Sequence, residues 1–139
     1  MAVPVLVDTG PLVAFLDRND PLHNWACSQV RELADPFLTC EAVLSECLYL
    51  TARFDPSGRG IHEMLQNGGL RIEFDLNDHL HAVARLMTKY QDVPMSLADA
   101  CLVRMSELFD RSQVFTIDSD FKLYRRNGRQ AIPLIFPQP

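Results

Sequence analysis

Short apolar segments that suit β-strands alternate with longer helix-like segments along most of this chain. Apolar runs and period-two patterns predict strands at residues 3–7, 37–39, 70–74, 113–117 and 131–136. Helical spacing and turn signals predict helices at residues 12–16, 21–33, 41–53, 78–90 and 97–109, with a weaker helix ending at Gln66. Such alternation is typical of a parallel sheet covered on both faces. We therefore expect an α/β fold, a three-layer α/β/α sandwich with a central, mostly parallel sheet.

Length and composition indicate one globular domain. The chain has 139 residues, of which 47% are hydrophobic and 22% charged, which is enough apolar material for a single core. No linker or repeat divides the chain, so we expect one domain over residues 1–139. No apolar run approaches the ~20 residues that span a bilayer, and Asp8 interrupts the first apolar run early, unlike a signal peptide. These features predict a cytoplasmic protein.

The cysteines and histidines show neither a disulfide framework nor a zinc-site pattern. No C-x-x-C pair occurs, and the histidines lack zinc-ligand spacing with the cysteines. Cys47 and Cys101 lie in apolar helical runs, which favours core packing. We expect no disulfide and assign no function to the histidines.

Four acidic residues adjoin or interrupt apolar segments: Asp8, Glu46, Asp99 and Asp118. Asp8 follows the first predicted strand, and Asp118 follows the fourth. A buried carboxylate without a partner is costly, and sites in parallel sheets form at the carboxyl ends of strands. If the four acids converge, a hard divalent cation such as Mg²⁺ is the natural partner.

Three of these acids also have a purely local interpretation. Asp8 suits the N-cap of the helix that contains Pro11. Ser96 and Asp99 have the spacing of a capping box. Asp118 suits the cap of the turn that follows it. Capping and metal binding are compatible, so these interpretations do not exclude a shared site.

Glu46 is the acid least expected in its surroundings. It shares a helical face with Arg53 and would pair with it if it were an ordinary boundary residue. Glu41 competes for the same role, but it falls in the first helical turn, where an acid complements the helix dipole. We therefore place Glu41 outside the site.

In this order and context the acidic motifs resemble those of one family. The motifs are residues 5–9, 43–50, 96–100 and 116–121, and together they span nearly the whole chain. They resemble the PIN-domain nucleases, especially the VapC-type toxins of prokaryotic toxin–antitoxin systems. Gly10 departs from the pattern, because many members carry Ser there.

The resemblance implies a metal-dependent endoribonuclease that cleaves RNA phosphodiester bonds. Asp8, Glu46, Asp99 and Asp118 would be the catalytic residues and would hold one or two Mg²⁺ or Mn²⁺ ions. Accessory residues that orient these ligands or the scissile phosphate would be Thr9, Ser96, Thr116 and Asp120. The basic residues Arg125, Arg126 and Arg129 would contact the RNA backbone; a solvated basic tail is the alternative.

Partners follow from the same resemblance: an RNA substrate, a cognate antitoxin protein and a second copy in a homodimer. The apolar residues of segment 10–34, including Trp25, would form the interface or pack in the core. Two other functions stay open. One is an RNA-processing or DNA nuclease outside toxin–antitoxin systems, and the other is a non-catalytic PIN-like interaction module.

The net charge bears on these alternatives. The formal net charge is −5, which alone argues against a nucleic-acid partner because such proteins usually present a basic surface. However, Lys122 and the three nearby arginines cluster close to the C-terminus, and a bound metal would offset several acids. The charge therefore does not exclude RNA binding.

Overall fold

The computed structural model describes residues 3–139. Its centre is a five-stranded sheet with the order β3-β2-β1-β4-β7, in which all neighbouring strands are parallel. The strands are β1 (Val5–Val7), β2 (Phe37–Thr39), β3 (Leu70–Ile72), β4 (Gln113–Phe115) and β7 (Leu134–Ile135). The expected parallel sheet is confirmed, and β7 is an edge strand, as Pro133 predicts.

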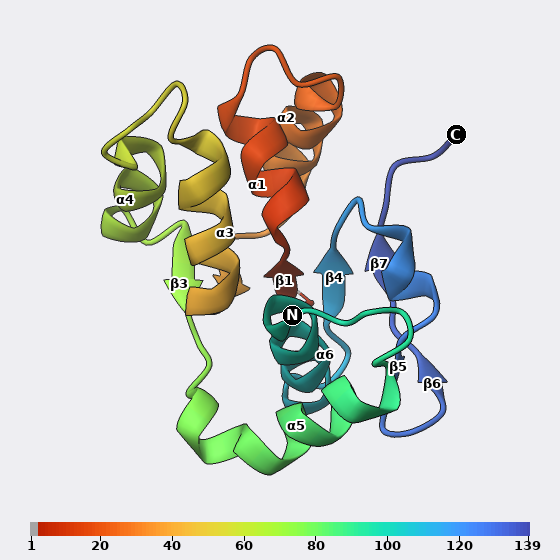
Figure 1. The fold of residues 1–139 in the computed structure, drawn as a ribbon. Coiled ribbons are helices and arrows are strands. Elements are labelled where there is room, and N and C mark those ends of the chain that lie inside the picture. The colour runs from red at the N-terminus through yellow and green to blue at the C-terminus, as the bar shows by residue number, and fades with distance from the viewer. Residues whose placement is uncertain (1–2) are drawn as a thin grey trace.

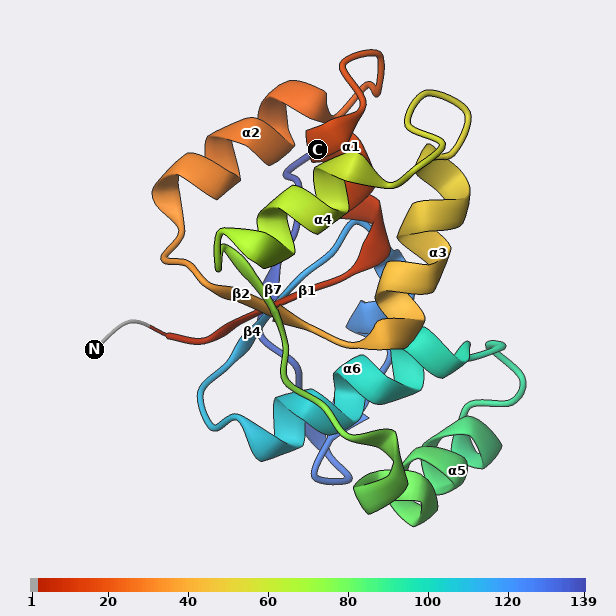
Figure 2. The ribbon, with the colours of Figure 1, turned by 90° about the vertical axis from the view of Figure 1, so that its left-hand side faces the viewer.

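Helices cover both faces of this sheet (Figures 1 and 2). One face carries α1 (Thr9–Leu16), α2 (His23–Glu32) and α4 (Arg59–Gln66), and the other carries α5 (Leu80–Lys89) and α6 (Leu97–Leu108). Helix α3 (Glu41–Thr51) contacts both α1 and α6, and it lies near the carboxyl end of β1 (Figure 2). The three-layer α/β/α sandwich expected from the sequence is therefore confirmed.

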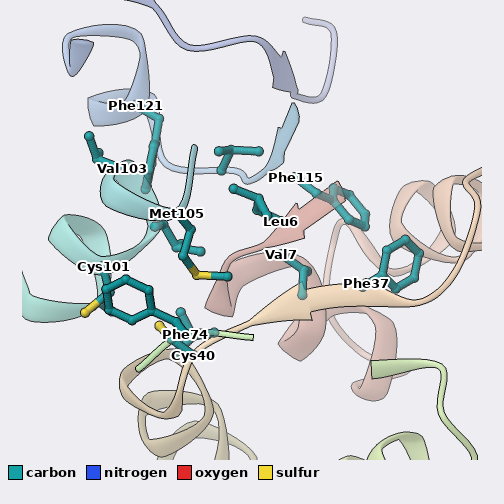
Figure 3. Close-up of a cluster of buried hydrophobic side chains, with 14 of the residues drawn as sticks. Leu6, Val7, Phe37, Cys40, Phe74, Cys101, Val103, Met105, Phe115 and Phe121 are labelled. Atoms are coloured by element: carbon teal, nitrogen blue, oxygen red, sulfur yellow. The ribbon is translucent and has the colours of Figure 1, made fainter. Parts of the chain in front are cut away.

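The core lies against the central strands. All three residues of β1 are buried, which fits a strand covered on both faces. Figure 3 shows Leu6 and Val7 of β1 among buried side chains from β2, β4 and α6. Phe115 lies between two further rings, 5.4 Å from Trp25 and 6.1 Å from Phe37 between ring centroids. Core packing thus accounts for Trp25.

The structure differs from the predicted elements near several ends. The predicted strand 113–117 ends at Phe115, and the predicted helix 78–90 divides into the 3-10 helix η1 (Leu76–His79) and α5. A second 3-10 helix, η2 (Ser119–Lys122), follows β4. Strand ends and short helices are decided by caps and neighbours more than by apolar spacing.

A small antiparallel hairpin near the C-terminus was not predicted, and the predicted strand 131–136 divides between Ala131 in this hairpin and β7. It consists of β5 (Arg125–Arg126) and β6 (Gln130–Ala131). The turn uses Asn127 at φ 51° and Gly128 at φ 84°, which are residues that tolerate this left-handed backbone. Two-residue strands carry no measurable periodicity, so the sequence pattern did not reveal them. Within residues 3–139, no helix has the length and apolarity needed to cross a membrane.

Candidate functional site

All four acids line a single pocket of about 330 Å³, hereafter the acid pocket. They come from four places in the chain: the ends of β1 and β4, helix α3, and the first turn of α6. A larger cavity, of about 720 Å³, is bounded by Cys40, Phe74 and Cys101 and contains none of the four. The smaller pocket therefore holds the clustered carboxylates.

Asp8 is fixed by hydrogen bonds on both carboxylate oxygens. It is the N-cap of α1, where the backbone N–H of Thr9 donates to Oδ1 over 2.8 Å. The Thr116 hydroxyl donates to Oδ2 over 2.7 Å. Burial leaves the side chain with 6% exposure and raises its pKa to about 6, against the lowering effect of these hydrogen bonds; the charges of Asp99 and Asp118 raise it further.

Asp99 is held in the first turn of α6. It forms the capping box predicted with Ser96, whose hydroxyl accepts from the Asp99 backbone N–H over 3.0 Å. The Tyr124 hydroxyl donates to Asp99 Oδ2 over 2.9 Å. Burial raises the Asp99 pKa, while the hydrogen bond from Tyr124 opposes that rise. Tyr124 was not among the predicted site residues, and no local motif in the sequence marks it.

Glu46 projects from α3 and is exposed. Its Oε2 accepts a hydrogen bond of 3.1 Å from the hydroxyl of Thr9, the residue after Asp8. Arg53 does not pair with Glu46; it forms an ion pair of 2.6 Å with Asp17. The boundary ion pair considered for Glu46 is therefore replaced by a contact with the α1 N-terminus.

Asp118 is half-buried and caps η2, where its Oδ1 accepts from the backbone N–H of Asp120 over 2.9 Å. Its own backbone N–H donates to the Thr116 hydroxyl oxygen over 3.0 Å. Thr116 thus connects two of the four acids, because the same hydroxyl donates to Asp8. The local capping interpretation is correct, and it coexists with the shared pocket.

The sequence model of the PIN domain matches residues 5–127. The chain belongs to the PIN domain family. Ribonuclease VapC26 of Mycobacterium tuberculosis is 26% identical over 124 residues, covering 82% of this chain and 86% of the relative. The crystal structure of M. tuberculosis VapC20, described as a sarcin-ricin loop cleaving toxin, superposes with a TM-score of 0.76 at 17% identity, over 86% of this chain and 93% of that one. The VapC-type resemblance expected from the motifs is confirmed.

The donor set of this PIN domain suits a divalent cation. None of the ion pairs in residues 3–139 involves the four acids. No group of three or more acidic, histidine or cysteine side chains within that range already has metal-ligand geometry. The carboxylates instead accept hydrogen bonds from protein hydroxyl and N–H groups. Several oxygen donors that share a pocket without a basic side chain fit a hard cation.

The remaining predicted residues divide between the acid pocket and other surfaces. Thr9 lines the pocket, and so does Asp20, which sequence reasoning had taken only as part of a helix start. Asp20 Oδ1 accepts from the Leu22 backbone N–H over 2.8 Å. Asp120 is not part of the lining, and Glu41 lines the larger cavity instead, outside the site as predicted.

The three predicted RNA-contacting arginines lie away from the acid pocket. Arg125 lines a different pocket, beside α5. Arg126 donates from Nη1 to the Ser106 carbonyl over 3.2 Å, which ties the hairpin to α6. Arg129 is exposed in the hairpin turn. The structure therefore separates the clustered acids from the basic C-terminal segment.

Gly10, the residue that departs from the usual family pattern, is explained by its neighbour. A Cβ atom placed at Gly10 would lie 2.4 Å from Cγ1 of Ile117. Both residues line the acid pocket. Ile117 occupies the space that a larger residue at position 10 would require, so the two positions are coupled.

Proposed function

We propose that this protein is a metal-dependent endoribonuclease that acts as the toxin of a toxin–antitoxin pair. The observation that carries the proposal is the convergence of Asp8, Glu46, Asp99 and Asp118 on one pocket of a PIN domain. The relatives support the ribonuclease assignment, since one is named a ribonuclease and the other a toxin that cleaves the sarcin-ricin loop.

In this proposal the four carboxylates hold one or two Mg²⁺ or Mn²⁺ ions. When bound, the metal would activate a water as nucleophile and neutralise charge that develops on the phosphate. The Thr116 hydroxyl donates to the Asp8 carboxylate and accepts from the backbone N–H of Asp118. Thr9 donates to Asp8 through its backbone N–H and to Glu46 through its hydroxyl. Ser96 and Tyr124 hold Asp99. These neutral donors orient the carboxylates without cancelling the charge that attracts the cation.

The high pKa of Asp8 has a specific role in this proposal. Near pH 6 a substantial fraction of Asp8 is protonated, because its pKa is about 6. A cation beside the carboxylate favours the charged form, so metal loading would release a proton. The metal would therefore bind more weakly as the pH falls below about 6.

The expected partners are an RNA substrate, a cognate antitoxin and a second copy of the chain in a homodimer. The names of the relatives support the first two; the third rests on family resemblance. A toxin acting on cellular RNA would work in the cytoplasm. A small upstream gene for a DNA-binding antitoxin would support the toxin role over that of an RNA-processing nuclease.

The test is cleavage of a mixed pool of single-stranded RNA by protein freed of any copurified partner. The parent should cleave in Mg²⁺ or Mn²⁺ and stop when EDTA is added. Asp8→Asn should abolish cleavage, because the amide preserves the size of the side chain but removes a charge that holds the cation. Glu41→Gln is the matched control, since it removes one carboxylate outside the pocket, and it should cleave like the parent.

Circular dichroism of both variants checks that the fold is retained. EDTA-resistant cleavage, or an Asp8→Asn variant as active as the parent, would overturn the metal-nuclease assignment. Cleavage confined to DNA would favour the alternative DNA nuclease. No cleavage of either nucleic acid, by protein shown to bind Mn²⁺, would favour the interaction module.

A further inference from the structure

We propose that a second, basic pocket binds backbone phosphates of the RNA substrate at a distance from the cleavage site. This step rests on the function proposed above. The pocket has a volume of about 330 Å³ and includes Arg85, Lys89, Arg104 and Arg125 in its lining; it is hereafter the cation pocket. Its lining residues come from α5, α6 and the β5–β6 hairpin, and Figure 1 shows where these elements lie.

Two of its cations stand one helical turn apart on α5. Arg85 and Lys89 have i,i+4 spacing, which places like charges side by side and disfavours the helix. Among residues 3–139, neither side chain takes part in an ion pair. Lys89 Nζ instead donates to the Gly128 carbonyl over 3.2 Å and lies 5.2 Å from the centroid of the Tyr90 ring. Its partners are neutral, so its positive charge stays available to an anion.

The carboxylate in the lining is already engaged on both oxygens. Glu107 Oε1 accepts from Arg104 Nη1 over 3.0 Å, and Oε2 accepts from the Asn127 backbone N–H over 2.7 Å. Glu107 thus neutralises Arg104 by an ion pair. Among residues 3–139, the other three cations of the pocket have no carboxylate partner: Arg85, Lys89 and Arg125. Arg125 Nη1 donates to three consecutive backbone carbonyls, at 2.8–3.3 Å, which fixes its guanidinium without neutralising it.

This excess is unusual for a chain with a net charge of −5. Several cations elsewhere are paired with carboxylates: Arg53 with Asp17, Arg59 with Glu63, and Arg71 with Glu73. The cation pocket therefore concentrates positive charge in an otherwise acidic molecule. A polyanion is attracted to such a region, and its phosphates displace counterions from it.

A short structural path connects the cation pocket to the acid pocket. Arg125 directly follows Tyr124, whose hydroxyl donates to Asp99. The backbone N–H of Arg125 donates to the Tyr90 hydroxyl over 2.9 Å, and the Tyr90 and Tyr124 rings pack 5.0 Å apart between centroids. In the proposal, an RNA strand whose scissile phosphate lies in the acid pocket places phosphates further along its backbone in the cation pocket.

The experiment measures binding of a labelled single-stranded RNA pool to the Asp8→Asn protein, which should bind without cleaving. The test variant adds Arg85→Gln and Lys89→Gln. The control variant adds Arg31→Gln on α2 and Arg59→Gln on α4. Both residues are exposed, and their helices cover the opposite face of the sheet from α5 (Figure 2). Both variants lose two positive charges, so a general effect of net charge would be equal in the two.

We expect the test variant to bind RNA about tenfold or more weakly and the control to stay within about twofold, because direct phosphate contacts dominate affinity. The slope of log affinity against log salt should fall by roughly 1.4 in the test variant, because each phosphate that is no longer neutralised reduces the slope by about 0.7. With Asp8 restored, the KM for RNA cleavage should rise in the test variant while kcat is retained.

The proposal that the cation pocket binds RNA would be wrong if RNA affinity fell equally in the two variants, or if the salt slope of the test variant were unchanged. A parent that binds no RNA would overturn it as well. These results are separable from failure of the proposed function. If the parent cleaves RNA but the test variant binds RNA like the control, only the proposed role of the cation pocket is refuted. If the parent does not cleave RNA but mutation of the cation pocket weakens its RNA binding, only the proposed nuclease function is refuted.

Discussion

The hydroxyl of Tyr124 donates a hydrogen bond of 2.9 Å to Oδ2 of Asp99. The two residues are 25 positions apart in the sequence, and Tyr124 is fully buried beneath the site. Burial and the nearby carboxylates raise the pKa of Tyr124 above its ordinary value, so the hydroxyl keeps its proton and remains a donor. The C-terminal segment thereby holds an acid of α6 in place.

Replacing Tyr124 with Phe should change the pH dependence of the site. The hydrogen bond from Tyr124 lowers the Asp99 pKa, so this pKa should rise when the hydroxyl is lost. The acidic limb of the RNA-cleavage profile should then move to higher pH. Stability should fall by about 1 kcal/mol, the usual cost of removing one hydrogen bond. The measurement is kcat/KM against pH, together with denaturant unfolding.

Tyr90→Phe is the matched control, because its hydroxyl accepts from the Arg125 backbone N–H and does not contact the acids. The control should lose a similar amount of stability and keep the acidic limb of the parent. A shift of equal size in both variants would show that Tyr124 acts through packing alone.

Thr9 should matter to cleavage through its hydroxyl. Thr9→Val keeps the shape but removes the donor to Glu46 Oε2, so Glu46 should lose its fixed orientation. We expect cleavage to fall about tenfold or more, the usual effect of losing a group that orients a metal ligand. Thr9→Ser restores the hydroxyl and should recover most of the activity. A Thr9→Val variant that cleaves as fast as the parent would show that the hydrogen bond to Glu46 is not needed.

The metal-free protein should lose stability as pH rises through the range in which Asp8 ionises. The folded-state pKa of Asp8, about 6, exceeds its ordinary value of 3.8, so the folded state retains a proton that the unfolded chain has released. The stability contribution is complete below about pH 4 and is lost between about pH 4 and 6. Its full size is on the order of 3 kcal/mol.

Asp8→Asn isolates this effect. Unfolding free energies measured in EDTA at pH 4, 5, 6 and 7 should show a fall in the parent that is smaller in the variant. Part of the fall should persist, because the Asp99 pKa is also raised. Parallel curves for the two proteins would mean that Asp8 ionises at its ordinary pKa.

Divalent metal should stabilise the folded parent, because it binds the native carboxylates and hardly binds the unfolded chain. At about 100 times the dissociation constant the gain is roughly 2.7 kcal/mol. For a domain of this size that gain raises Tm by roughly 10 °C. Thermal melts with and without Mn²⁺ provide the measurement, and Asp99→Asn should show a smaller rise. An unchanged Tm in the parent at high Mn²⁺ concentration would contradict metal binding by the four acids.

Much of the architecture could be predicted because it depends on local patterns. The apolar run at residues 3–7 predicts a short buried strand, and β1 forms within it at Val5–Val7. The Ser96-x-x-Asp99 spacing predicts a capping box, and both of its hydrogen bonds form. The four acids could be selected because each adjoins apolar neighbours, where a carboxylate is costly.

The contacts between the acids depended on the tertiary structure. The register of β1 against β4 pairs Val7 with Phe115, which brings the next residues, Asp8 and Thr116, together across 108 positions of sequence. The Tyr124–Asp99 contact and the cation pocket arise in the same way, from the packing of separate segments. Sequence determined most of the strands and helices, though not the β5–β6 hairpin, because hydrophobic spacing and capping act within a few residues. Only the folded chain decided which side chains meet, because strand register and helix packing set distances between residues that share no local pattern.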